Sequence, residues 1–197
     1  MHLALHGLAI KKHGTPDGVA GLMGLEVARA KALLAQASTE GRATETAGAY
    51  MLTPTARMAL EGEYSRVYAD QRASADFVAA YERFETVNRA LKQLITDWQT
   101  IEIAGQRVPN DHANKAHDEA IIDRLGRLHE QAEAVLKALG LDLPRLAIYG
   151  KKLLAALEKA EDGAIEWVSG AKIESYHTLW FELHEDLLRI LGRERDD

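Results

Sequence analysis

A stretch from Glu63 to Thr100 without proline or glycine constrains the fold of this chain more than any other feature. Within it, large apolar residues recur at steps of three and four, the spacing of one face of an α-helix. They are Phe77, Tyr81, Phe84, Leu91, Ile95 and Trp98. The pattern predicts one long helix, or two in series with a break between residues 70 and 74.

The sequence that follows predicts more helices and one irregular link. Residues 101–111 contain Ala104-Gly105 as a turn between two short alternating segments, and Asn110 or Asp111 is placed to cap the next helix. Further helices are expected up to Leu139, from Pro144 to about Asp162, and over residues 174–188. We therefore predict a helical bundle domain over residues 61–197, with a sub-break near residues 102–112.

Residues 1–60 have a different pattern. Helices are expected from Leu3 to near Gly14, after the cap Thr15-Pro16, and over residues 26–39. The segments RATET and AYMLT then alternate as two short strands joined by Ala47-Gly48. Thr53-Pro54 is placed to begin another helix. This order predicts three helices and a small β-hairpin.

The phrase YMLTPTAR, residues 50–57, resembles the Tyr-x-Leu-Thr-x-x-Gly-Arg phrase that closes the wing in bacterial winged-helix regulators. Examples are the multiple-antibiotic-resistance and phenolic-acid-repressor families. The resemblance covers about residues 2–60 and implies a mainly α fold with an N-terminal winged helix followed by the helical bundle. It also implies a recognition helix in the DNA major groove with the wing on the backbone. Residues that would contact DNA are then Arg29, Lys31 and Arg42.

The distribution of charge indicates that any polyanion would bind to residues 1–60, but it does not require such a partner. Residues 1–60 carry six basic and four acidic groups, so they come to +2, and the remainder of a chain with net charge −6 comes to −8. The expected recognition helix begins with Glu26, which DNA phosphates repel, and it offers few basic side chains. A winged helix used for docking to a protein or for dimerisation therefore remains an open alternative.

Composition excludes several other classes. Without cysteine, the chain has no disulfide framework, no thiolate zinc site and no cysteine nucleophile. No apolar run approaches the roughly 20 residues that span a bilayer, so we expect a cytoplasmic protein without membrane attachment. Gly-rich phosphate loops, Gly-x-Ser-x-Gly and His-Glu-x-x-His are also missing. The sequence identifies neither a catalytic residue nor a cofactor and does not favour an enzyme.

Polar and aromatic residues lie on the apolar stripes of the expected bundle helices. They are Asn88, Trp98, Asp118, His129, His177, Trp180 and His184. Buried polar groups require partners. One interpretation is that they satisfy one another, and a second is a pocket for a polar or anionic small molecule. A third is a metal site, because Glu174 and His177 have the Glu-x-x-His spacing of di-iron bundles, although the motif occurs once.

A second resemblance concerns residues 75–193. Segments such as FETVNRALKQLITDWQ, PNDH and SYHTLWFELHEDLL are similar to a helical region of actinobacterial proteins associated with phosphoenolpyruvate-utilising enzymes, relatives of pyruvate phosphate dikinase and phosphoenolpyruvate synthase. This resemblance implies a non-catalytic accessory or regulatory subunit. Our main hypothesis is a dimeric winged-helix transcription regulator whose bundle senses a small-molecule effector or a partner. The alternative is the accessory subunit, docking to its enzyme through the winged helix.

Overall fold

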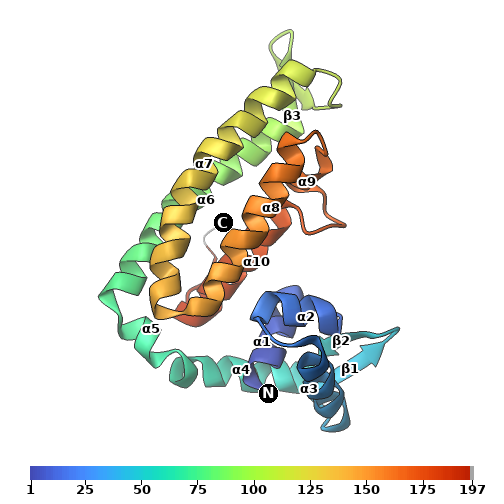
Figure 1. Ribbon diagram of the computed structural model, residues 1–197, viewed down its shortest axis with the longest axis vertical. Coiled ribbons are helices and arrows are strands. Elements are labelled where there is room, and N and C mark those ends of the chain that lie inside the picture. Colours follow the sequence, from blue (N-terminus) through green and yellow to red (C-terminus); the bar gives the residue numbers. More distant parts are fainter. Residues whose placement is uncertain (196–197) are drawn as a thin grey trace. The chain divides into compact units, whose positions relative to one another are not determined.

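The computed structural model describes residues 1–195 and has a mainly α fold with two small antiparallel sheets (Figure 1). The chain forms two compact units. The first comprises Met1–Ser74 together with the segment from Glu182 onward, and the second comprises Ala75–Phe181. The sequence had divided the chain after residue 60. In the structure the first unit therefore extends further along the chain and also takes in a distant C-terminal segment.

The first unit begins with three helices and a hairpin. Its elements are α1 (His2–Lys11), α2 (Pro16–Met23), α3 (Val27–Thr39), β1 (Ala43–Thr46), β2 (Ala49–Leu52), α4 (Pro54–Val67) and α5 (Ala69–Ala73). The hydroxyl oxygen of Thr15 accepts a hydrogen bond from the Gly18 amide at 3.2 Å, so α2 begins where its cap was predicted. Thr53 caps α4 in the same way through the amide of Ala56.

The hairpin is anchored to the helices that precede it. Ala47 and Gly48 both have positive φ, as a tight two-residue hairpin turn requires, and the strands pair from Ala43–Leu52 to Thr46–Ala49. On the other edge of β2, the amide of Gly14 donates to the Tyr50 carbonyl at 3.0 Å, and the Tyr50 amide donates back at 2.9 Å. The link between α1 and α2 is thus joined to the hairpin by an isolated antiparallel β-bridge.

The last helix, α10 (Tyr176–Leu191), contributes residues to both units. In the first unit its later turns contact α1, where His6 lies with Nε2 2.8 Å from Asp186 Oδ1 and Nδ1 2.9 Å from the Tyr64 hydroxyl. His6 and Asp186 are fully buried. Because a carboxylate only accepts, Nε2 donates to Asp186, and in the neutral ring Nδ1 then accepts from the Tyr64 hydroxyl. Burial raises the pKa of Tyr64, so its hydroxyl keeps its proton.

Further polar contacts join α10 to the rest of the first unit. Lys11 Nζ donates to Glu182 Oε1 at 2.8 Å, and Arg189 forms ion pairs with Glu61 and Glu185. Arg72 Nε donates to the carbonyl of Ile190 at 2.7 Å, which satisfies one of the free carbonyls at the helix end.

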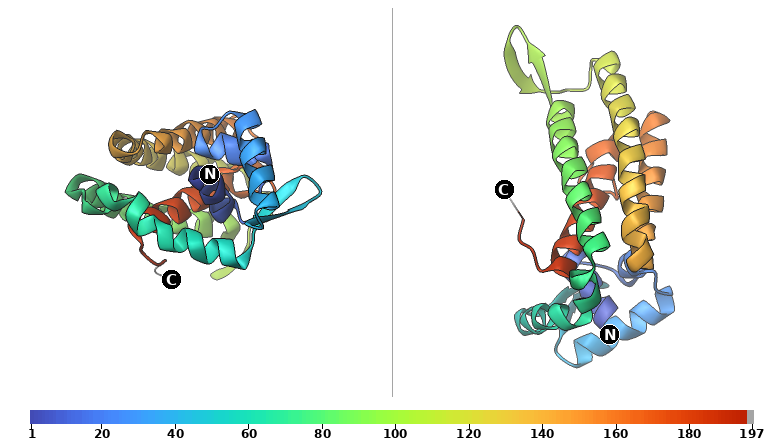
Figure 2. Two further views of the ribbon diagram at one scale, coloured as in Figure 1. Left: turned by 90° about the horizontal axis from the view of Figure 1, so that it is seen from below. Right: turned by 90° about the vertical axis from the view of Figure 1, so that its left-hand side faces the viewer.

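The second unit is a helical bundle. Its elements are α6 (Ala75–Gln99), β3 (Thr100–Ile103), β4 (Gln106–Pro109), α7 (Lys115–Asp142), the 3₁₀ turn η1 (Pro144–Leu146), α8 (Ala147–Glu161), α9 (Glu166–Ser169) and the first residues of α10. Helices α6 and α7 run side by side in opposite directions, and the β3–β4 hairpin projects at the end where they connect (Figures 1 and 2). Phe77, Phe84, Leu125, Leu139 and Leu153 are among the buried side chains that form its core.

One predicted boundary is confirmed and two are corrected. The break before α6 lies at Ser74, within the predicted interval of residues 70–74. Asn114, not Asn110 or Asp111, caps α7 by accepting from the His117 amide. Helix α7 also continues past Gly140 to Asp142, because an isolated glycine weakens a helix without ending it. Among the described residues, the helices are too short or too polar to span a membrane.

Replacing Asp186 with alanine should lower the free energy of unfolding by about 3 kcal/mol, because it leaves the His6 imidazole buried without its acceptor. Urea denaturation followed by circular dichroism measures this change. Asp70→Ala is the control, since Asp70 is exposed and its loss should cost no more than about 0.5 kcal/mol. Equal shifts for the two variants would contradict a stabilising role for the buried contact.

Candidate functional site

Helix α3 presents one buried and one exposed side. Ala30, Leu33, Leu34 and Ala37 pack into the first unit. Its exposed side consists of small, apolar and basic residues and one glutamine, namely Val27, Ala28, Arg29, Lys31, Ala32, Ala35 and Gln36. Arg29 and Lys31, two of the three predicted DNA contacts, therefore both lie on the solvent side of the helix.

Acidic residues reduce the positive charge of this surface. Arg42, the third predicted contact, has its Nε 3.3 Å from Glu40 Oε2, and its side chain is 48% exposed. Gln36 Nε2 donates to Glu40 Oε1 at 2.7 Å. Glu26 lies at the N-cap of α3, and Glu45 is exposed on β1. Arg42 is thus partly neutralised, while Arg29 and Lys31 carry the more available charge.

The seven residues predicted to line a pocket in the bundle fall into separate groups. Asn88, Trp98, Asp118, His129, Trp180 and His184 are buried, and His177 is half-buried. His184 belongs to the first unit, whereas the other six belong to the second. Trp180 Nε1 donates to Asn88 Oδ1 at 3.0 Å, and the Trp180 ring stacks on Phe84 with centroids 4.8 Å apart. Asn88 and Trp180 therefore satisfy each other.

His129 forms a second group with Tyr176. Its Nδ1 lies 3.1 Å from the Tyr176 hydroxyl, and the two rings meet edge to face. Burial lowers the pKa of His129, although Glu133 and Glu161 act in the opposite direction. Burial also lowers the pKa of His177. These imidazoles are thus held in surroundings that favour the neutral form.

Trp98 and Asp118 belong to a third group, which includes two residues that the sequence analysis did not assign to a site. Asp118 Oδ1 accepts from Asn110 Nδ2 at 2.9 Å, and its Oδ2 lies 3.0 Å from His112 Nδ1. The His112 ring lies against Trp98 with centroids 4.6 Å apart. Asn110 was expected to cap a helix. It instead ties the end of β4 to α6, because its Nδ2 also donates to the Trp98 carbonyl.

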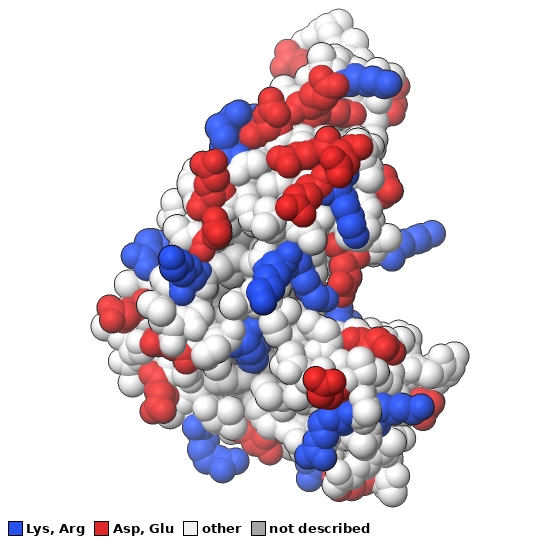
Figure 3. Space-filling model, viewed as in Figure 1, with Lys and Arg blue, Asp and Glu red and all other residues white. Residues whose placement is uncertain are grey.

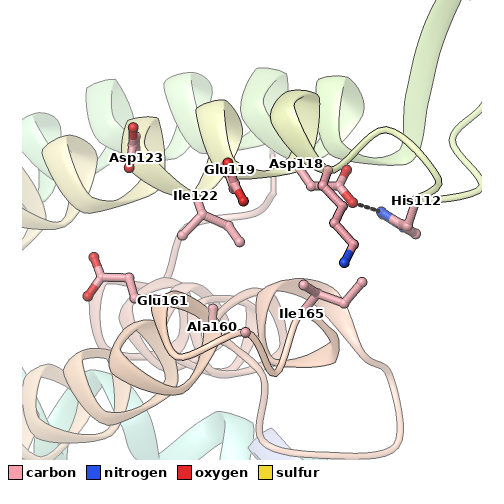
Figure 4. A pocket seen from close by; sticks show the side chains of 10 residues that line it. His112, Asp118, Glu119, Ile122, Asp123, Ala160, Glu161 and Ile165 are labelled. Carbon is pink, nitrogen blue, oxygen red and sulfur yellow. Dashed lines mark hydrogen bonds and ion pairs between the residues drawn. The ribbon is translucent and has the colours of Figure 1, made fainter.

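A cavity of about 430 Å³ opens beside this third group (Figure 4). It lies between the first turns of α7 and the segment that joins α8 to α9. It is lined by His112, Lys115, Asp118, Glu119, Ile122, Asp123, Ala160, Glu161, Gly163 and Ile165. Of the seven predicted pocket residues, Asp118 alone lines this cavity. Its walls are acidic, so they do not suit the anionic ligand that the sequence analysis allowed.

The metal interpretation gains no geometric support. Glu174 Oε2 accepts from Lys152 Nζ at 2.8 Å. Among residues 1–195, no three His, Asp or Glu side chains are grouped so that they could hold a metal ion.

Some missed residues carried a signal in the sequence. His6 interrupts the apolar run LALHGLAI, so it had to be either exposed or paired. Pro109-Asn110-Asp111-His112 combines turn-forming and hydrogen-bonding residues just before a helix, which favours a local polar network. No signal pointed to Asp186 as the partner of His6, because the two are separated by 180 residues.

The lowered pKa values of His129 and His177 predict how stability depends on pH. The pKa values of both histidines in the folded protein lie below the ordinary value of 6.5. At a pH between the folded pKa values and 6.5, the unfolded chain therefore binds more protons than the folded protein. The free energy of unfolding should therefore be highest above about pH 6.5, as far as these two groups determine it, and should fall as pH decreases through the folded pKa values. Urea unfolding across pH measures this slope, and His129→Gln/His177→Gln should flatten it. Greater stability of the native chain on acidification through this range would contradict the assignment.

Comparison of the chain with protein-family models, curated proteins and solved structures found no match.

Proposed function

We propose that the protein is a winged-helix transcription regulator whose first unit binds duplex DNA and whose bundle senses a small ligand. The observation that carries the proposal is the order α1, α2, α3, β1, β2, α4, with the hairpin tied to the α1–α2 link through Gly14 and Tyr50. A winged helix has this order of elements. Helix α3 is then the recognition helix, and the hairpin is the wing beside the DNA backbone.

The exposed side of α3 is compatible with close approach to a groove. The side chains of Ala28, Ala32 and Ala35 are short, so the backbone of α3 can lie close to the base edges. The methyl group of alanine can also contact the thymine methyl. Arg29 and Lys31 are long enough to reach phosphates or base edges from the same helix. Glu26 would approach DNA only where it accepts from a cytosine amino group.

The charge of this surface limits the strength of binding. With two available basic residues and one paired arginine, each subunit should neutralise about two or three phosphates, which corresponds to a shallow salt dependence. We therefore expect a homodimer on a two-fold operator, because two recognition helices double the number of contacts. The cavity lined by His112 and Asp118 is the candidate effector site of the bundle.

Duplex binding across a salt series tests the proposal. We expect log affinity to fall linearly with log salt on DNA from upstream of the protein's own gene. Arg29→Ala/Lys31→Ala should weaken binding and reduce the slope by about two per subunit. The matched control is Arg83→Ala/Lys92→Ala, which removes the same charge from exposed positions of α6 and should change nothing. Absence of binding by the wild-type chain at low salt would refute the regulator.

A second variant tests the role of Arg42. Glu40→Gln removes its ion-pair partner and one negative charge, so it should tighten duplex binding by about threefold. Glu102→Gln, an exposed change on β3, controls for net charge alone. Equal gains for both variants would show that Arg42 makes no specific contact.

Exposed apolar side chains in the first unit favour a second candidate function. Val27 and Met51 are each 47% exposed, and Met58 is 77% exposed. A protein-docking surface buries such side chains, as the accessory subunit of a phosphoenolpyruvate-utilising enzyme would require. Co-elution of the two purified proteins, lost in Val27→Ser/Met51→Ser, together with no duplex binding, would replace the regulator with this function.

A further inference from the structure

The cavity of the second unit has the size and the mixed lining of a small-molecule site. Its volume of about 430 Å³ falls within the range of such sites, roughly 300 to 1,000 Å³. Helix α7 supplies Glu119, Ile122 and Asp123 on one side, while Glu161 and Ile165 face them from the α8–α9 side (Figure 4). One end is closed by His112 and its partner Asp118.

The His112 imidazole is held in one place and one tautomer. Its Nδ1 lies 3.0 Å from Asp118 Oδ2, its ring lies against Trp98, and its backbone amide donates to Asn110 Oδ1 at 3.0 Å. A φ of 60° at His112 is uncommon for a side chain of this size, and the surrounding contacts hold it there. Since a carboxylate accepts, Nδ1 carries a proton, and in the neutral form of the ring Nε2 then has a lone pair. Among the described residues, no group donates to Nε2.

The walls of the cavity consist mainly of acceptors. Nε2 of His112 and the carboxylates of Glu119, Asp123 and Glu161 accept hydrogen bonds, whereas Lys115 is the cationic donor of the lining. Asp and Glu side chains also gather over this part of α7 and the α8–α9 end on the face seen in Figure 3. An anionic ligand would be repelled. A metal ion would lack a coordinating group of three side chains among residues 1–195.

We propose that this cavity binds a small organic cation bearing a primary amine or guanidino group. Its N–H groups donate to Nε2 of His112 and to the carboxylates of Glu119 and Glu161. Its short carbon chain lies along Ile122 and Ile165. The imidazole that lines one end of the cavity is held by Asp118 and Trp98, which gives the site a fixed polar group that scattered surface carboxylates lack. This inference deepens the proposed sensing function and rests on it for its biological role, while binding itself is measured without DNA.

Isothermal titration of the whole protein with agmatine at low salt tests the site, with N-butylurea as a neutral analogue of similar size. Agmatine should bind and N-butylurea should not. Glu119→Gln/Glu161→Gln should weaken agmatine binding at least about tenfold, and His112→Gln about fivefold. Glu130→Gln/Glu158→Gln is the matched control, because it removes one exposed carboxylate from each of α7 and α8 outside the cavity lining and should leave affinity unchanged.

A spectroscopic readout covers the case in which a variant does not fold. In ¹⁵N-histidine-labelled wild-type protein, agmatine should shift the Nε2 resonance of His112, whereas N-butylurea should not. The proposal is overturned by no heat and no shift at millimolar agmatine, by equal binding of the neutral analogue, or by equal losses in the site and control variants. Agmatine binding with no duplex binding would refute the regulator alone, and duplex binding without agmatine binding would refute this site alone.

Discussion

The buried contact between His6 and Asp186 is the interaction on which the first unit depends. Both side chains are excluded from water. His6 Nε2 supplies the donor and the Asp186 carboxylate supplies the acceptor, so each buried group has a hydrogen-bond partner. Tyr64 completes the set by donating to the second ring nitrogen. This contact fixes the later turns of α10 beside α1 in one register. Because Tyr64 lies on α4, the same cluster also joins α4 to these two helices. The ion pairs of Lys11 and Arg189 add to this anchoring at less buried positions.

The polar side chains of the second unit occur in two kinds of surroundings. Deep in the bundle, Asn88 accepts from Trp180 and donates to Glu85, and His129 contacts Tyr176, which supports the interpretation that buried polar side chains satisfy one another. Near the start of α7, Asp118 contacts one nitrogen of His112, and both residues line the cavity. The buried pairs specify the packing of the core, whereas the His112–Asp118 pair lines the cavity that we propose as a ligand site.

Local signals in the sequence predicted the local structure well. Thr15 and Thr53 act as caps, and Ala47-Gly48 and Ala104-Gly105 form tight turns with positive φ, because each needs only a few neighbouring residues. Periodicity also predicted the bundle. It could not predict that His184 belongs to the first unit, or that Asn110 binds Asp118 instead of capping a helix. Those outcomes depend on which segments meet in space, and hydrophobic spacing specifies the face of a helix but not its partner. The winged helix and its DNA contacts remain predictions.

The placement of α10 has a consequence for the order in which the chain is made. The ribosome releases α1 to α5 long before residues 182–191 exist, so His6 must wait for Asp186 through the synthesis of the entire bundle. During that interval the His6 imidazole does not have its contact with Asp186. A chain interrupted before Glu182 therefore cannot complete this unit. The protein thus links the integrity of its N-terminal surface to the completion of its last helix, and prematurely terminated copies would not present that surface in its finished form.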